Sequence, residues 1–71
     1  MEYLKVLFSE NREVIIDSLN SGQFTGEVIE VEAGHHIISL GGDQNFVPGE
    51  IKVTLKGSSV LDPEEVRFEK E

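Results

Sequence analysis

Hydrophobic and polar residues alternate with a period of two through most of the chain. This pattern is typical of β-strands that place one face in a core. Ile51, Val53 and Leu55 give the clearest case, since the residues between them are Lys52 and Thr54. The same alternation, or a short β-branched run, predicts about six strands, at residues 3–8, 13–17, 27–32, 35–40, 50–55 and 64–69.

Turn-forming residues separate these segments. Polar or glycine-containing stretches predict turns or loops at residues 9–12, 20–22, 33–34, 41–45 and 56–59. Residues 12–19 are the best candidate for a helix, but their Val and Ile content favours a strand. Asp62 and Pro63 allow one short helical turn at residues 62–65. The sequence therefore predicts an all-β fold, either a small antiparallel β-sandwich or an open barrel.

The inward positions of the strands supply a candidate core. A chain of 71 residues has room for one such core, so residues 1–71 are predicted to form a single β domain. So short a chain buries a modest share of its surface, which leaves both a monomer and a homodimer open. The predicted core consists of Leu4, Val6, Phe8, Val14, Ile16, Ile29, Val31, Ile38, Leu40, Ile51, Val53, Leu55, Val66 and Phe68.

Composition narrows the classes of partner. Fourteen acidic residues against six Lys and Arg give a formal charge of −8, and the chain has no Cys. Disulfides and Cys-ligated zinc are therefore excluded. Nucleic-acid binding needs a cationic face, so no nucleic-acid partner is predicted. Part of the acidic surplus falls on outward strand positions such as Glu30, Glu32, Glu50 and Glu69, and we interpret it chiefly as a solvated face that limits pairing between sheet edges.

The N-terminus and the hydropathy pattern bear on location. The opening residues, MEYLKVLFSENRE, do not combine a basic start with an apolar run, so no signal peptide is predicted. No stretch approaches the ~20 apolar residues of a membrane span, which predicts no membrane insertion. We expect the chain to be cytoplasmic as given, or to belong to the cell envelope if it is cut from a larger exported protein.

Four short motifs follow one another in a recognisable order. Leu4-Lys5-Val6 is followed by an apolar strand that ends in Asp17, and then by Ala33-Gly34-His35 with an alternating strand up to Leu40. Phe46-Val47-Pro48 then leads into residues 51–55. In this order, residues 4–57 resemble the PEGA domain, a small β module found beside other domains in bacterial and archaeal proteins. The resemblance implies a β-sandwich-like accessory or interaction module, often near the cell envelope, that has no catalytic residues.

The chain departs from the PEGA pattern at three places. Asp17-Ser18 stands where the family usually has Asp-Gly, and Thr25-Gly26 stands where it has Thr-Pro. The first turn lacks the family's Pro. Residues 58–71 lie beyond the pattern.

The adjacent residues His35 and His36 are the first candidates for metal binding. Neighbours on a strand point to opposite faces, so the pair cannot chelate one ion, and zinc needs three or four ligands. His36 shares the parity of Ile38 and Leu40, so we expect it to be half-buried, to bond across the turn and to give sensitivity to pH near neutrality. His35 is expected to be exposed. No metal or cofactor is predicted.

Two further patterns in the sequence are candidates for ligand binding or catalysis. The segment Gly41–Asn45 lacks the helix and Lys of a phosphate loop and the six oxygens of a calcium loop, so we expect a mobile hairpin loop. Carboxylate pairs such as Glu30 with Glu32 and Glu64 with Glu65 lie on predicted strands, away from any cleft that glycoside hydrolysis would need. No Gly-x-Ser-x-Gly element is present. An enzyme is not predicted.

The leading functional prediction is a non-catalytic interaction or accessory module that presents loops and sheet edges to a protein partner. Residues 20–24 and 41–48 are the candidate loops, because aromatic residues stand among polar ones there. The candidate interaction residues are Phe24, Asp43, Gln44, Asn45 and Phe46. The alternatives are a carbohydrate or small-ligand binding module at the same loops, or an acidic inhibitor of a basic protein.

Overall fold

The computed structural model describes residues 1–71 and contains nine short strands and no helix. The strands are β1 (Glu2–Leu7), β2 (Glu13–Ile16), β3 (Leu19–Phe24), β4 (Val28–Val31), β5 (Gly34–Leu40), β6 (Phe46–Val47), β7 (Ile51–Leu55), β8 (Glu64–Arg67) and β9 (Glu69–Lys70). The all-β prediction is confirmed. The segments expected from the alternation are β1, β2, β4, β5, β7 and β8, while β3, β6 and β9 are additional.

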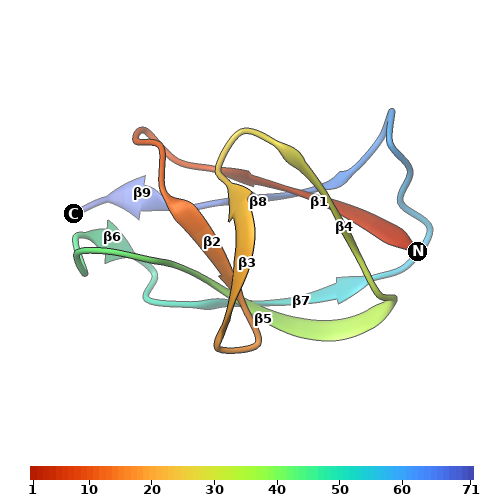
Figure 1. The fold of residues 1–71 in the computed structure, drawn as a ribbon, viewed down its shortest axis with the longest axis horizontal. Helices are drawn as coiled ribbons and strands as arrows, with labels where there is room; N and C mark the ends of the chain where they lie inside the picture. The colour runs from red at the N-terminus through yellow and green to blue at the C-terminus, as the bar shows by residue number, and fades with distance from the viewer.

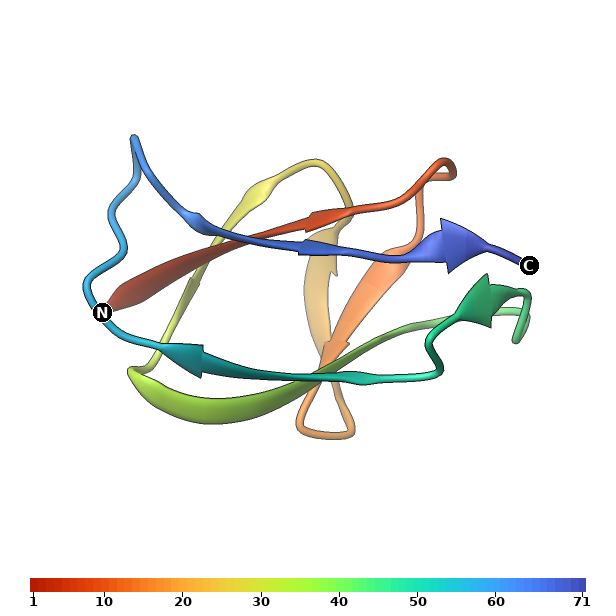
Figure 2. The same cartoon turned by 180° about the vertical axis from the view of Figure 1, so that it is seen from behind.

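Two open sheets enclose one core. The first sheet has the strand order β4-β1-β8 and the second has the order β3-β2-β5-β7 (Figure 1). A two-stranded ribbon of β6 and β9 lies at the end of the molecule that holds the C-terminus (Figure 2). The strands β3, β4, β7 and β8 therefore each have a neighbour on one side only, and their other side is a free edge.

One strand pair departs from the antiparallel arrangement that we expected. The first strand, β1, lies in the middle of its sheet and pairs in parallel with β8, with Val6 opposite Val66. Its other neighbour, β4, is antiparallel, with Leu4 opposite Ile29. Most of the chain separates β1 from β8, so no hairpin turn forces the two strands to run in opposite directions.

The core contains eleven buried hydrophobic side chains in a single cluster. Every residue of the predicted core belongs to this cluster or packs against it, the partly buried ones being Phe8, Ile16, Ile51 and Val53. Phe46 is an additional member, with 4% of its surface exposed. Its ring meets those of Phe8 and Phe68 edge to face, with centroids 6.2 Å and 5.5 Å away.

The turn that we expected at residues 20–22 is wrong. The chain reverses three residues earlier, at Asp17 and Ser18, which both have positive φ, 53° and 68°. A two-residue hairpin with positive φ at both positions matches the natural twist of the strands, and Asp tolerates this conformation well. Residues 19–24 consequently form the strand β3. Ser21 and Gly22 lie where the register with β2 shifts, between Glu13 and Ile15.

The short helical turn expected at residues 62–65 is also absent, because β8 begins at Glu64. Asp62 is already engaged with the preceding turn. Its N–H and its carbonyl both bond the backbone of Ser59, each at 3.1 Å. The chain thus has no helix long and apolar enough to cross a membrane.

Candidate functional site

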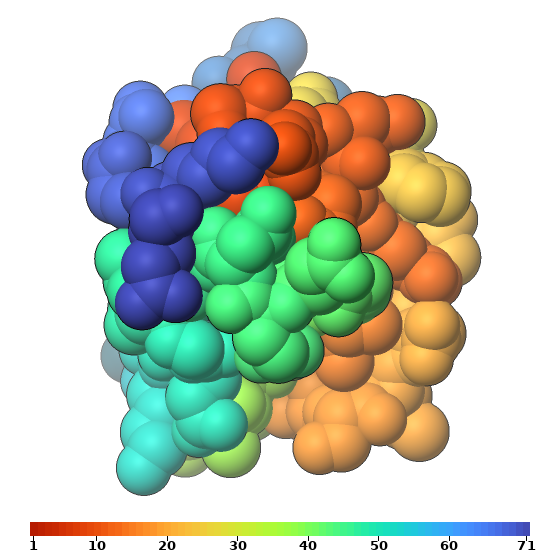
Figure 3. All heavy atoms as spheres, turned by 90° about the vertical axis from the view of Figure 1, so that its left-hand side faces the viewer, coloured from red at the N-terminus to blue at the C-terminus, as the bar shows by residue number.

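The residues of the two candidate loops lie on both sides of one strand. Phe24 is the last residue of β3 and pairs with Glu13 in β2. On the other side of β2, the N–H of Gly41 donates to the carbonyl of Glu13 at 2.9 Å. Figure 3 shows the residues that follow β5 in the middle of one end of the molecule, between the β1–β2 connection and the C-terminus. The two predicted segments therefore lie on opposite sides of β2, and the one that follows β5 lies at this end of the molecule.

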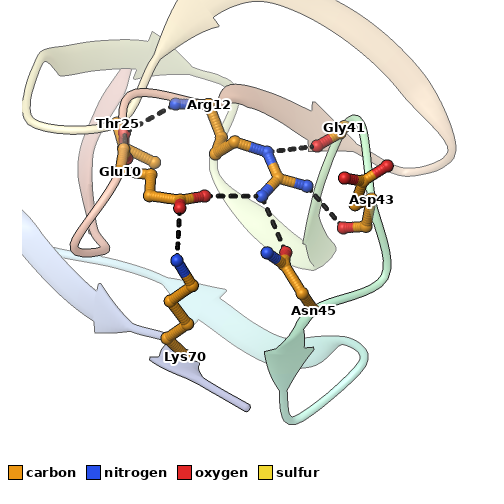
Figure 4. Close-up of polar contacts among 7 residues, drawn as sticks. All are labelled: Glu10, Arg12, Thr25, Gly41, Asp43, Asn45 and Lys70. Atoms are coloured by element: carbon orange, nitrogen blue, oxygen red, sulfur yellow. Dashed lines mark hydrogen bonds and ion pairs between the residues drawn. The ribbon is translucent and has the colours of Figure 1, made fainter.

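Arg12 holds the loop that follows β5. Its Nε donates to the carbonyl of Gly41 at 2.8 Å, and its Nη1 donates to Oδ1 of Asn45 at 2.8 Å. Nη2 donates to the carbonyl of Asp43. Figure 4 shows these bonds converging on one guanidinium group. The loop is therefore attached to Arg12 at three points, and its expected mobility stays a prediction.

The guanidinium of Arg12 also lies beside two aromatic rings. Its central carbon is 5.7 Å from the ring centroid of Phe8 and 5.7 Å from that of Phe46. The faces of aromatic rings attract cations, and the attraction strengthens when water is excluded. Only 12% of the Arg12 side chain is exposed. The rings and the hydrogen bonds together compensate for the removal of this charge from water.

Glu10 links Arg12 to the C-terminal strand. Its Oε1 accepts from Nη1 of Arg12 at 3.1 Å, and its Oε2 accepts from Nζ of Lys70 in β9 at 2.6 Å. The hydrogen bond from Lys70, followed by that from Arg12, lowers the pKa of the Glu10 carboxyl below its ordinary value. The Thr25 hydroxyl donates to the carbonyl of Glu10 at 2.8 Å and accepts from the N–H of Arg12 at 3.1 Å. We call Glu10, Arg12 and Asn45 the arginine cluster.

The expectation that Phe46 is an exposed loop aromatic is wrong. It starts the strand β6 and lies in the core, because its ring fills the space between Phe8, Phe68 and the guanidinium of Arg12. Phe24 is 41% exposed, as its candidate role requires. Asp43 and Gln44 are also exposed, whereas Asn45 is half-buried in the arginine cluster.

Sequence reasoning missed Arg12 altogether and placed it in a polar turn. One signal for it was present, since Arg12 is one of two arginines in a strongly acidic chain and lies near Phe8. Its partners in the loop are mainly backbone carbonyls, which any residue type provides. No sequence pattern could therefore identify them.

The chemical capacity of the arginine cluster is small. A guanidinium has five N–H donors, and four hydrogen bonds already occupy Arg12. It has little left to offer an anionic ligand. The depression beside it is lined by Phe8, Ser9, Asn11, Arg67 and Lys70 among others, and it is open to solvent. The arginine cluster therefore attaches the loop after β5 and the C-terminal strand β9 to the connection between β1 and β2.

The two histidines lie as the strand geometry predicts. The Nδ1 of His35 is 2.8 Å from the hydroxyl of Thr54, on the outer surface of β5 and β7. His36 turns the other way and bonds the backbone of Glu32 across the turn between β4 and β5. The half-buried state of His36 and the exposed state of His35 are both confirmed. No three His, Asp or Glu side chains in the chain form a group that could hold a metal ion.

Acidic residues concentrate on the free edges of the first sheet. Glu30 and Glu32 lie on and just after β4, and Glu64 and Glu65 lie on β8. All four are exposed. The negative charge of Glu30, 3.3 Å from the Tyr3 hydroxyl, raises the pKa of Tyr3. Of these four carboxylates, only that of Glu30 accepts a hydrogen bond from within the chain.

Comparisons with known proteins add no relative to this description. No protein-family model, no curated protein and no solved structure matches the chain.

Proposed function

We propose that this domain is a non-catalytic interaction module that binds an extended, basic segment of a protein partner along the free edge of β4. An accessory module of the PEGA type, which the sequence resembles, would have such a role. The observation that carries the proposal is the position of β4. It is an edge strand, its inner residues are anchored in the core, and its outer residues are acidic or exposed.

The loops have less to offer a partner than the sheet edges. The loop after β5 uses its carbonyls and the Asn45 side chain to bind Arg12, and Phe46 is buried. Of the aromatic residues proposed for contact, only Phe24 is accessible. Binding of a carbohydrate at these loops has little support, because the aromatic surface that would stack on a sugar ring is reduced to one side chain.

Among the four free edges, β4 combines regular backbone and matching chemistry. The register of β3 with its neighbour is interrupted, and β8 follows Pro63 and ends in Arg67. In β4 the register with β1 is unbroken. An incoming strand could continue the ladder of hydrogen bonds there, as in other complexes formed by strand addition.

The side chains of β4 indicate the composition of the partner. Ile29 and Val31 are 3% and 9% exposed and face the core, while Val28 is 41% exposed on the outer face beside Glu30. Glu32 follows at the end of the strand. A partner strand with alternating apolar and basic residues would place Lys or Arg near these carboxylates, and opposite charges across neighbouring strands are stabilising. The charge of −8 would also accelerate the approach of a basic segment.

A peptide of about six residues that alternates valine and lysine is a suitable probe. We expect it to shift the backbone amide signals of β4 in NMR titrations. The double variant Glu30→Gln/Glu32→Gln should weaken binding by about three- to tenfold, the range expected for two exposed ion pairs. The matched control is Glu64→Gln/Glu65→Gln, which changes the net charge equally but acts on β8. It should retain nearly full affinity.

Two outcomes would contradict the proposal. Equal loss of affinity in both double variants would mean that the peptide responds only to the overall charge, as an acidic inhibitor of a basic protein would. Undiminished binding of a peptide N-methylated on alternate residues, at the amides that would face β4, would exclude strand addition, because that peptide lacks the N–H donors of the ladder.

A further inference from the structure

His36 places both of its ring nitrogens on oxygen atoms. Its Nδ1 is 2.7 Å from Oδ2 of Asp17, in the turn between β2 and β3. Its Nε2 is 2.7 Å from the backbone carbonyl of Glu32, which precedes β5. The side chain is 13% exposed. One imidazole ring therefore connects its own strand to two separate turns.

Neither of these oxygens can donate a hydrogen bond. A backbone carbonyl only accepts, and an ionised carboxylate only accepts. A neutral imidazole has a single N–H, so it can satisfy one of the two contacts and must point a lone pair at the other oxygen. The imidazolium form has two N–H groups and satisfies both. The geometry thus selects the protonated ring.

Asp17 is in turn fixed by its own bonds. Its Oδ1 accepts from the N–H of Ile37 at 2.9 Å, and its own N–H donates to the carbonyl of Ile37 at 2.8 Å. The carboxylate therefore cannot move away from His36 without breaking the contact between the turn and β5. When His36 loses its second proton, one of its two contacts must therefore break, either the one with Asp17 or the one with the carbonyl of Glu32.

We propose that His36 is a proton-operated latch, closed when the ring carries two protons and weakened when the ring becomes neutral. In the closed state it fastens the β2–β3 turn and the β4–β5 connection to β5. In the neutral state one of these two contacts is lost, and the corresponding turn is held less tightly to β5.

The charges around His36 mainly favour the protonated form of its ring. The carboxylate of Asp17 faces the ring from the β2–β3 turn, and that of Glu32 lies next to the carbonyl contact. On the neighbouring strand β7, Val53 lies opposite His36 and Lys52 carries a positive charge beside it, while His35 projects from the opposite face of β5. The hydrogen bond to Asp17, more than any other cause, raises the pKa of His36, and burial offsets only part of this effect.

Because folding raises the pKa of His36, the folded protein should be less stable at higher pH. A histidine in the unfolded chain titrates at about 6.5. The latch therefore contributes its full stabilisation below about pH 6.5 and loses it as the pH rises through the higher pKa of the folded state. The folding equilibrium constant should fall by about tenfold for each unit by which folding raises this pKa.

NMR spectra of the ring nitrogens and urea unfolding between about pH 5.5 and pH 9, the range around the ordinary histidine pKa, test the latch. In the wild-type protein, both nitrogens of His36 should show the imidazolium signature at the acidic end. The midpoint of unfolding should fall as the pH rises. This fall should vanish in His36→Gln and persist in the control His35→Gln, whose ring has one hydroxyl partner.

Titration of the wild-type ring decides the case even if His36→Gln does not fold. A His36 signal that titrates at or below the ordinary histidine value would overturn the proposal. A neutral ring with a single N–H at the acidic end of the range would overturn it as well.

Discussion

At the scale of single residues, one arginine organises a segment that looked unstructured in the sequence. Arg12 bonds the carbonyls of Gly41 and Asp43 and the side chain of Asn45, while its guanidinium lies beside two rings. Its planar fork can reach several acceptors at once, which an ammonium group cannot do. The ordering of this loop thus depends on a side chain that lies about thirty positions earlier in the chain.

Substitution of Arg12 is expected to destabilise the fold. Arg12→Ala removes several charge-assisted hydrogen bonds, among them those to the carbonyls of Gly41 and Asp43, and takes the guanidinium away from the rings of Phe8 and Phe46, so the free energy of unfolding should fall by about 2–4 kcal/mol. Arg12→Lys should lose nearly as much stability as Arg12→Ala, because an ammonium group cannot reach the same acceptors at once. Arg67→Ala, at an exposed position, should change the stability by less than about 0.5 kcal/mol. Equal effects of both alanine variants in urea denaturation would show that Arg12 has no special role.

At the scale of strands and turns, the period-two alternation located the core residues of the regular strands, but not Phe46 and not the turns. It located inward positions such as Leu4, Val6 and Ile38 because burial on one face of a strand leaves a direct mark in the sequence. The residue types of Asn20–Gly22 favour a turn and led to the prediction of a chain reversal there. The reversal is formed by Asp17 and Ser18 instead. The order β4-β1-β8 could not be predicted, since pairing between distant strands leaves no local signal.

The β2–β3 hairpin can be tested through Ser18. A non-glycine residue at φ 68° is strained, and glycine is the preferred second residue of such two-residue hairpins. We expect Ser18→Gly to raise the free energy of unfolding by about 0.5–1 kcal/mol, after the greater flexibility of the unfolded chain is subtracted. Ser9→Gly is the control, because Ser9 lacks positive φ. A lower stability of Ser18→Gly in thermal or urea unfolding would contradict the assignment of strain.

At the scale of the whole molecule, negative charges far outnumber the ion pairs that could balance them. Fourteen acidic residues surround a small fold that has three ion pairs, of which one involves a histidine. Repulsion among the carboxylates disfavours the compact state and also keeps the free edges of two copies apart. The same surplus that costs stability therefore suits a domain that leaves its sheet edges open.

Salt should stabilise this domain. When sodium chloride is raised from about 10 mM to about 150 mM, the screening length shortens to about 8 Å and the repulsion weakens. The midpoint of thermal unfolding should increase. The gain should be smaller in Glu64→Gln/Glu65→Gln, which starts with less repulsion. A decrease with salt would instead mean that attractive pairs such as Lys70 with Glu10 outweigh the repulsion.

The parallel pairing of β1 with β8 also determines how the domain can be joined to other chains. The chain enters at one end of the long axis and leaves at the other (Figure 1). The longest dimension of the fold is 31 Å. A linker that joined the two termini would need about ten extended residues to cover that distance. A short turn could therefore not join the two ends of residues 1–71, and a fusion partner attached at each end would lie on opposite sides of the fold.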